Sequence, residues 1–305
     1  MSEFEQTVKG ILRNNFAFEP TAKMLVLGDT STSILAKRFV EALKNDERLA
    51  DYMEMLDRSR SGEEPPQEIS DTWLKYDVVF CLTKHSLTHT VARKNANANG
   101  VSVITMPGIT EDMFINGAMK ADYSLVEKET IEMAEKLTQA KSLSVTTGAN
   151  GEYTLFMPLE KRPGIASTGV FKEKVASGNL PSGEAYIAPI EYEAEGQIEI
   201  TGSIAGIGLL SEPVVLTIEK GRLIEATGEI GKRLFSILGS GDGRLLCELG
   251  IGTNYEARVT GLILEDEKAY NTIHVAFGSN HTFGGVINTD VHIDCVTIGP
   301  ILKWE

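Results

Sequence analysis

The sequence has few cysteines, no long apolar run and an acidic start, and each of these features excludes a class of protein. The three cysteines, Cys81, Cys247 and Cys295, are far apart in apolar stretches, so we expect reduced, buried thiols rather than a disulfide framework. No segment approaches the roughly 20 consecutive apolar residues of a membrane-spanning helix. The N-terminal segment is acidic where a signal peptide is basic, and we therefore expect a cytoplasmic protein.

Basic residues are also in short supply. The chain holds 29 lysines and arginines against 43 aspartates and glutamates, which gives a formal charge of -14. Such a field repels phosphate backbones and anionic lipid surfaces, so we expect neither nucleic acid nor a membrane as a partner. An acidic balance suits a site that concentrates cations, although it also serves solubility in many proteins.

Regular patterning is present, and in the N-terminal half it alternates between strands and helices. Apolar runs at 24–30, 76–83 and 101–108 have the composition of buried strands. The segments 33–46 and 89–100 between them have helical spacing and helix-ending residues. Strands that alternate with helices predict a parallel sheet.

The pattern changes near residue 141. A charged helical segment over 110–140 ends the first half, and beyond it short strand-like runs are broken by glycine, with at most one helix, in EIGKRLFSILGSG. We therefore predict an α/β protein with two domains. We expect residues 1–140 to form a Rossmann-like domain with a parallel sheet and residues 141–305 to form a β-rich α+β domain. Since three of the five histidines lie in this second domain, we expect it to bind metal and carry catalysis.

Histidines are rare, and their positions are the first indication of chemistry. The five fall into two clusters, His85 with His89, and His274, His281 and His292. On a strand, His292 and Asp294 are two apart and share one face, where they can hold an ion together. The same periodicity aims His274 at one face of a neighbouring strand. Alternatively, an isolated HxD is a satisfied polar pair on a sheet surface.

Two acidic residues extend this candidate set. Glu184 in NLPSGEAYIAP and Glu248 in LLCELGIGTN lie among apolar residues, and a buried carboxylate needs a partner, which is either a metal or a hydrogen-bond donor at a strand end. Imidazoles with carboxylates suit zinc, cobalt, manganese or ferrous iron, and spacing alone does not choose among them. The charged run 264–268 is typical of a solvated turn. His89 is either a residue next to a helix cap or a substrate contact.

Four motifs in order, NLPSGEAYIAP, ELGIGTN, HVAFGSNHTFGG and HIDCV, resemble the aminopeptidase T (M29) family of metallopeptidases. The resemblance implies a leucyl aminopeptidase or aminopeptidase T-like enzyme that removes the N-terminal residue of small peptides with a free N-terminus. It implies two divalent ions, such as zinc, cobalt or manganese. It also implies a homodimer or larger homo-oligomer. The residues matching the family's metal ligands are Glu184, Glu248, His274, His292 and Asp294.

One position departs from that family. Its tyrosine, seven residues after the histidine of the HVAFG-like strand, corresponds here to His281. The resemblance also implies catalytic roles for Glu184 and Glu248, and for His281 at the position of the tyrosine. His281 would donate a hydrogen bond when protonated or act as an extra ligand.

The segments SLTHTVAR and ITMPGIT resemble a second group, the 2,5-dihydroxypyridine 5,6-dioxygenases. That likeness implies one Fe(II) held by His274, His292 and Asp294, with Glu184 and His89 lining a pocket for a hydroxylated ring. A third interpretation, from a different class, is a metal-stabilised scaffold without turnover.

Overall fold

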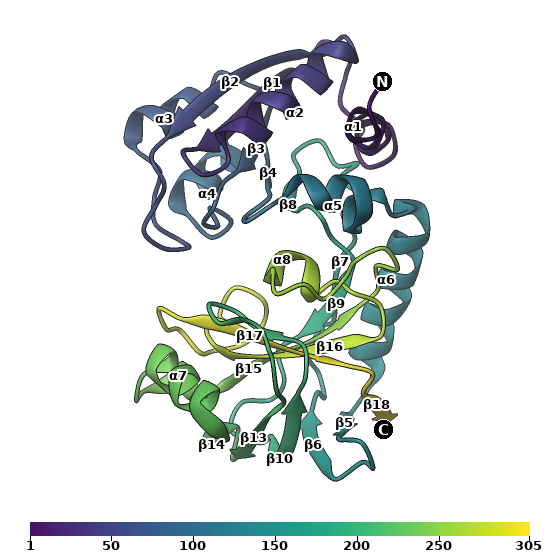
Figure 1. The fold of residues 1–305 in the computed structure, drawn as a ribbon, viewed down its shortest axis with the longest axis vertical. Helices are drawn as coiled ribbons and strands as arrows, with labels where there is room; N and C mark the ends of the chain where they lie inside the picture. The colour runs from purple at the N-terminus through teal and green to yellow at the C-terminus, as the bar shows by residue number, and fades with distance from the viewer. The chain divides into compact units, whose positions relative to one another are not determined.

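The computed structural model describes residues 1–305, and their contacts form two compact units (Figure 1). The first unit comprises Met1–Leu125 with Gly169–Ser182, and the second comprises Val126–Thr168 with Gly183–Glu305. The chain therefore passes between the units three times. This division differs from a single boundary near residue 141, because the last helix of the expected first domain belongs to the second unit and a later strand returns to the first.

The first unit is built on a five-stranded parallel sheet in the order β2-β1-β3-β4-β8. The strands predicted from apolar runs are β1, β3 and β4, and their residues are almost entirely buried. The bounds are α1 Glu3–Asn14, β1 Lys23–Asp29, α2 Ser33–Asn45, β2 Leu49–Met55, α3 Gln67–Trp73, β3 Val78–Leu82, α4 Val91–Ala98, β4 Ser102–Thr105, α5 Glu111–Asn116, the 3₁₀ helix Ala118–Lys120 and β8 Ser177–Asn179.

The second unit packs two antiparallel sheets around one core. A six-stranded sheet has the order β14-β13-β10-β6-β5-β18, and a seven-stranded sheet has the order β12-β11-β17-β16-β15-β9-β7. The bounds are α6 Tyr123–Gln139, β5 Ser142–Thr147, β6 Tyr153–Pro158, β7 Ile165–Ser167, β9 Glu184–Ile187, β10 Glu195–Ile200, β11 Ser203–Ile204, β12 Gly208–Leu209, β13 Val214–Glu219, β14 Arg222–Ala226, α7 Gly228–Leu238, the 3₁₀ helix Asp242–Arg244, β15 Leu246–Gly252, α8 Ile263–Asp266, β16 Thr272–Gly278, β17 His292–Ile298 and β18 Ile301–Trp304.

The core of the second unit takes up one face of the seven-stranded sheet, so a site can form only from residues on the other face. Apolar residues from both sheets form one buried cluster, to which β15 and β16 contribute Leu249, Ile251, Ile273, Val275 and Phe277. These are alternate residues of each strand, so their side chains lie on one face of the seven-stranded sheet. The residues between them therefore face away from this core.

The observed architecture confirms the predicted fold class, an α/β half with a parallel sheet and a β-rich half with antiparallel sheets. All three cysteines are buried and unpaired, as expected. The second half has two helices, α7 and α8, where at most one was expected. None of the helices has both the length and the apolar composition that a membrane crossing requires.

Candidate metal centre

Four neighbouring strands of the seven-stranded sheet, β17, β16, β15 and β9, carry the predicted ligands on one face. Cross-strand pairing sets Glu248 opposite Ala276 and Ala276 opposite Asp294. The same pairing sets Gly250 opposite His274 and Gly252 opposite Glu184. Directly opposed residues point to the same side of a sheet. The register therefore brings together all five residues that the sequence indicated, including His292 through its pair Gly278.

Small residues on this face make room for the larger ones. Between the acids and histidines stand Gly250, Gly252, Ala276 and Gly278. A Cβ atom at Gly250 would collide with the imidazole of His274, so the ring lies directly over the glycine backbone. The absence of a side chain at Gly250 thus lets His274 lie flat between the neighbouring acids.

One cluster on this face joins Glu248, His292 and Asp294, whose ligand atoms all lie within 4.8 Å of one another. The Nε2 atom of His292 lies 3.4 Å from Oε2 of Glu248 and 3.3 Å from Oδ1 of Asp294. Its Nδ1 atom lies 2.9 Å from the backbone carbonyl oxygen of Ser279, which accepts a hydrogen bond when Nδ1 is protonated. That bond orients the ring and leaves Nε2 available to an ion.

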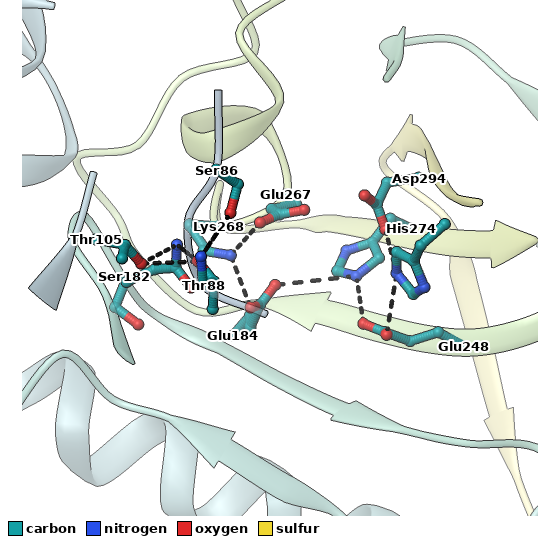
Figure 2. A network of polar contacts seen from close by, with 12 residues as sticks. Ser86, Thr88, Thr105, Ser182, Glu184, Glu248, Glu267, Lys268, His274 and Asp294 are labelled. Carbon is teal, nitrogen blue, oxygen red and sulfur yellow. Dashed lines mark hydrogen bonds and ion pairs between the residues drawn. The ribbon is translucent and has the colours of Figure 1, made fainter. Parts of the chain in front are cut away.

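A second cluster joins Glu184, Glu267 and His274, again with ligand atoms within 4.8 Å. The Nε2 atom of His274 lies 3.9 Å from Oε2 of Glu184 and 3.2 Å from Oε1 of Glu248. Figure 2 shows the His274 imidazole between these two carboxylates. The ammonium group of Lys268 donates to Oε1 of Glu184 at 2.6 Å and to Oε1 of Glu267. The two clusters therefore meet at His274 and Glu248.

The charges of the site shift its ionisation. Burial by itself lowers the pKa of His274, but the hydrogen bond to Glu248 and the charges of Glu184 and Asp294 outweigh it and raise that pKa to about 9. For Asp294, burial by itself raises the pKa. The charge and the hydrogen bond of His292 outweigh burial and hold the pKa of Asp294 well below its usual value. In the metal-free protein, protons on the rings thus supply positive charge among the carboxylates.

The donor set fits a divalent cation. Oε2 of Glu184 and Nδ1 of His274 are buried and have no hydrogen-bond partner. A buried acceptor without a partner is costly, and a cation beside Glu184 and Nε2 of His274 would satisfy the oxygen. Carboxylate oxygens with imidazole nitrogens are ligands of zinc, cobalt, manganese and ferrous iron.

The charged run 264–268 is not the solvated turn that was expected. Glu265, Asp266 and Lys268 are all fully buried, and Glu267 is half-buried beside the site. The run starts on the short helix α8, and each charge has a partner within the second unit. Glu267 and Lys268 are therefore site residues that sequence reasoning missed, because burial of a charged run depends on contacts remote in sequence.

Tyr186 is another residue that the motifs did not single out. It pairs with Gly250, so it lies on the site face, and its ring packs edge-on against Phe283 at 5.4 Å between centroids. Burial, and after it the charges of Glu248 and Glu184, raise the pKa of Tyr186. The sequence signal was its position two residues after Glu184 on a strand.

The remaining histidines lie elsewhere. His281 is exposed in the loop after β16, and its Nδ1 atom lies 2.9 Å from Oγ of Ser279. His89 is exposed in the first unit, in the turn before α4, whose N-cap is Thr90 rather than His89. The five ligand candidates belong to the second unit, so contact of His89 with a substrate stays a prediction. His85 also lies in the first unit, where its backbone carbonyl accepts a hydrogen bond from Thr83.

Comparison with known proteins gives one family. The sequence profile described as thermophilic metalloprotease (M29) matches residues 115–287, which include Glu184, Glu248, Glu267 and His274. No curated protein matches the chain at a significant level.

Among the solved structures that match the chain, two are similar over almost its whole length. The 2,5-dihydroxypyridine dioxygenase from Pseudomonas putida KT2440 has a TM-score of 0.79 at 16% identity, over 99% of this chain and 94% of that one. Wild-type AmpT from Thermus thermophilus has a TM-score of 0.70 at 15% identity, over the same shares of the two chains. At these identities the likeness establishes the fold alone, and both resemblances seen in the sequence reappear in the structure.

Proposed function

The chain belongs to the thermophilic metalloprotease (M29) family, and from that premise we propose that it is a metal-dependent aminopeptidase acting on small peptides with a free N-terminus. The match spans more than half of the chain. It ends before His292 and Asp294, whose place in the site rests on the geometry described above.

One observation carries the proposal. Both oxygens of the Glu248 carboxylate face histidines, Oε1 towards His274 and Oε2 towards His292. Each histidine also faces an acid of its own, Glu184 or Asp294. This arrangement suits two divalent ions: Glu184 and His274 would hold one, His292 and Asp294 would hold the other, and Glu248 would contribute to both.

Ions held there would lower the pKa of a shared water and polarise the scissile carbonyl. The protein's own groups do the rest. Ser279 holds the His292 ring through its carbonyl, and Gly250 lets His274 lie between two acids. A carboxylate at the site, that of Glu184 or Glu248, would take the proton of such a water.

His281 is proposed as a donor to the oxygen of the tetrahedral intermediate, from the loop that also carries Ser279. Substitution by the tyrosine typical of the family tests this role. His281→Tyr should raise peptide hydrolysis, because a phenol always carries a hydroxyl donor, whereas the nitrogen of a neutral imidazole that carries the proton depends on the tautomer. The measurement is kcat on unblocked peptides. His281→Ala is the matched control, because it removes the side-chain donor altogether. Equal rates in all three proteins would remove His281 from the mechanism.

The function itself is tested by metal content and peptide release. Elemental analysis of protein purified without chelator should find about two zinc, cobalt or manganese ions per chain, and His292→Ala should lose them. The loaded protein should then release N-terminal residues from a panel of unblocked peptides. Absence of any release with added cobalt or zinc would reject the aminopeptidase.

The structural likeness to the dioxygenase supports a second candidate, a ring-cleaving oxygenase with one Fe(II) at His274, His292 and Asp294. About one iron per chain, with oxygen uptake on hydroxylated rings, would favour it over the peptidase. If the protein binds metal but turns over neither peptides nor hydroxylated rings, the result would favour a metal-stabilised scaffold protein.

A further inference from the structure

Lys268 is the one ammonium group in the candidate centre, and it is almost completely buried, with 1% of its surface exposed. Its Nζ atom donates to Oε1 of Glu184 at 2.6 Å and to Oε1 of Glu267 (Figure 2). One carboxylate is enough to neutralise the charge of a buried lysine. Lys268 instead donates to two carboxylates, and both belong to the same cluster. The arrangement therefore does more than compensate a charge.

The first consequence concerns Glu184. Lys268 occupies Oε1, while Oε2 is buried, has no hydrogen-bond partner and lies 3.9 Å from Nε2 of His274. A free carboxylate can present either oxygen or both to an ion. With Lys268 in place, Glu184 presents Oε2 alone.

The second consequence concerns Glu267. Its carboxylate is close enough to Glu184 and His274 to join the same ion, and Oε1 of that carboxylate accepts a hydrogen bond from Lys268. Without the ammonium group, the centre would contain four carboxylates, those of Glu184, Glu248, Glu267 and Asp294, with no fixed positive charge. A divalent ion would then draw Glu267 in as an additional anionic ligand.

We propose that Lys268 is a positioning residue of the metal centre, a built-in cation that makes Glu184 a one-oxygen ligand and keeps Glu267 out of the coordination shell. This inference rests on the proposed function, because it assigns the roles of residues around the same ions. It concerns how the ligands are presented, and Lys268 itself need not touch a substrate.

The test compares wild type with Lys268→Met, which keeps an unbranched apolar chain and removes the charge, and with Lys268→Met/Glu267→Gln. Cobalt is titrated into metal-free protein by calorimetry, and the visible absorption of the bound Co(II) reports its ligands. We expect Lys268→Met to bind cobalt at least as tightly as wild type, with an altered absorption spectrum. The double variant should move the spectrum only part of the way back to that of wild type, because Glu267 can no longer add an anionic ligand while Glu184 still presents both oxygens.

Peptide hydrolysis gives the second readout. We expect kcat of Lys268→Met to fall at least about tenfold, the effect typical of losing a residue that orients a metal ligand, with cobalt retained. A residue that only supported the fold would lose metal and activity together. An unchanged cobalt spectrum and kcat in Lys268→Met would overturn the proposal, as would loss of cobalt in parallel with activity.

Glu267→Gln alone covers the case in which Lys268→Met does not fold. If Glu267 stays outside the coordination shell, this variant should keep the wild-type cobalt spectrum and stoichiometry. A changed spectrum would show that Glu267 is a ligand in wild type and would overturn the proposal. If wild type binds cobalt but cleaves no peptide, the aminopeptidase is rejected. The cobalt spectra of wild type and of the Lys268→Met variants then decide the role of Lys268. Wild type that binds no cobalt would reject both.

Discussion

Two buried carboxylates, one in each unit, show what separates a structural acid from a site acid. Asp29, at the end of β1 in the first unit, accepts from the backbone N–H and hydroxyl of Thr32 on Oδ1 and from the N–H of Lys84 on Oδ2. Glu184, at the start of β9 in the second unit, has Lys268 on one oxygen and no partner on the other. Both are buried, and only Glu184 has capacity left for a ligand.

The same contrast holds between neighbours within the second unit. Asp266 is fully buried, and its oxygens accept from Ser203 at 2.5 Å, from the N–H of Thr260 at 2.7 Å and from the N–H of Gly261 at 2.9 Å. Glu267, the next residue, lies in the candidate metal centre. Burial of an acid therefore does not identify a site, and what distinguishes Glu184 from the other two acids is a buried carboxylate oxygen without a donor.

The largest effect on metal binding is expected from Glu248→Gln. This change removes the charge from the carboxylate that faces both histidines, so both ions lose a ligand. We expect cobalt affinity to fall by about 100-fold or more, at or beyond the upper end of what loss of a supporting partner costs. Calorimetric titration measures it, and an affinity within a few-fold of wild type would show that Glu248 does not bridge the ions.

Asp294→Asn should have the next largest effect. Its carboxylate faces His292 in the cluster that these two residues form with Glu248, so one ion loses a charged ligand while the other keeps its own. Affinity for that ion should fall roughly 10-fold or more. Elemental analysis after dialysis should then find fewer ions per chain than in wild type, and an unchanged content would show that Asp294 is not a ligand.

Gly250→Ala tests the backbone beneath His274. A methyl group there would collide with the imidazole, which must move away from Glu184 and Glu248. We expect about tenfold weaker binding of the ion beside His274, and a loss of about 1–3 kcal/mol in the free energy of unfolding, as in overpacked cores. Gly241→Ala, where the added Cβ meets nothing within 4 Å, is the control. Equal cobalt titrations for the two variants would contradict the prediction.

Asp29→Asn should leave metal binding unchanged. The substitution replaces one of the two carboxylate oxygens by a donor, which would then face the N–H or hydroxyl groups that Asp29 now accepts from. Leaving such groups unsatisfied should lower the free energy of unfolding by about 1–3 kcal/mol. Denaturant unfolding measures that loss, and a cobalt titration of the same protein provides the contrast. Weakened cobalt binding would show that Asp29 is coupled to the centre.

The ligand candidates could be singled out from the sequence because their pattern is local. The alternation in HIDC puts His292 and Asp294 on one side of a strand, and a lone Glu248 between apolar residues indicates a buried acid. A further signal went unused. Small residues follow Glu248 and His274 at every second position along their strands, namely Gly250, Gly252, Ala276 and Gly278. Strand periodicity therefore places the small and the polar residues on the same face.

Other features depended on contacts that no local pattern encodes. Strand β2 was not predicted because LADYMEM lies at the sheet edge, where only Ala50 and Met55 are buried. The return of β8 to the first unit follows from its pairing with β4, in which Ser177 lies opposite Val103. The segment 110–140, expected as one helix, is divided into α5, a 3₁₀ turn and α6.

By itself the sequence determined the fold class, because that follows from the periodicity of strands and helices. It also singled out five side chains that now face one another, through strand spacing for His274, His292 and Asp294, and through apolar surroundings and the family resemblance for Glu184 and Glu248. Only the tertiary structure decided that Glu267 and Lys268 belong to the centre. Their burial comes from docking of the segment after α8 against β9, whose Glu184 lies 84 positions away in the chain. Charged residues in sequence look alike whether water or another charge solvates them, and only folding shows which of the two it is.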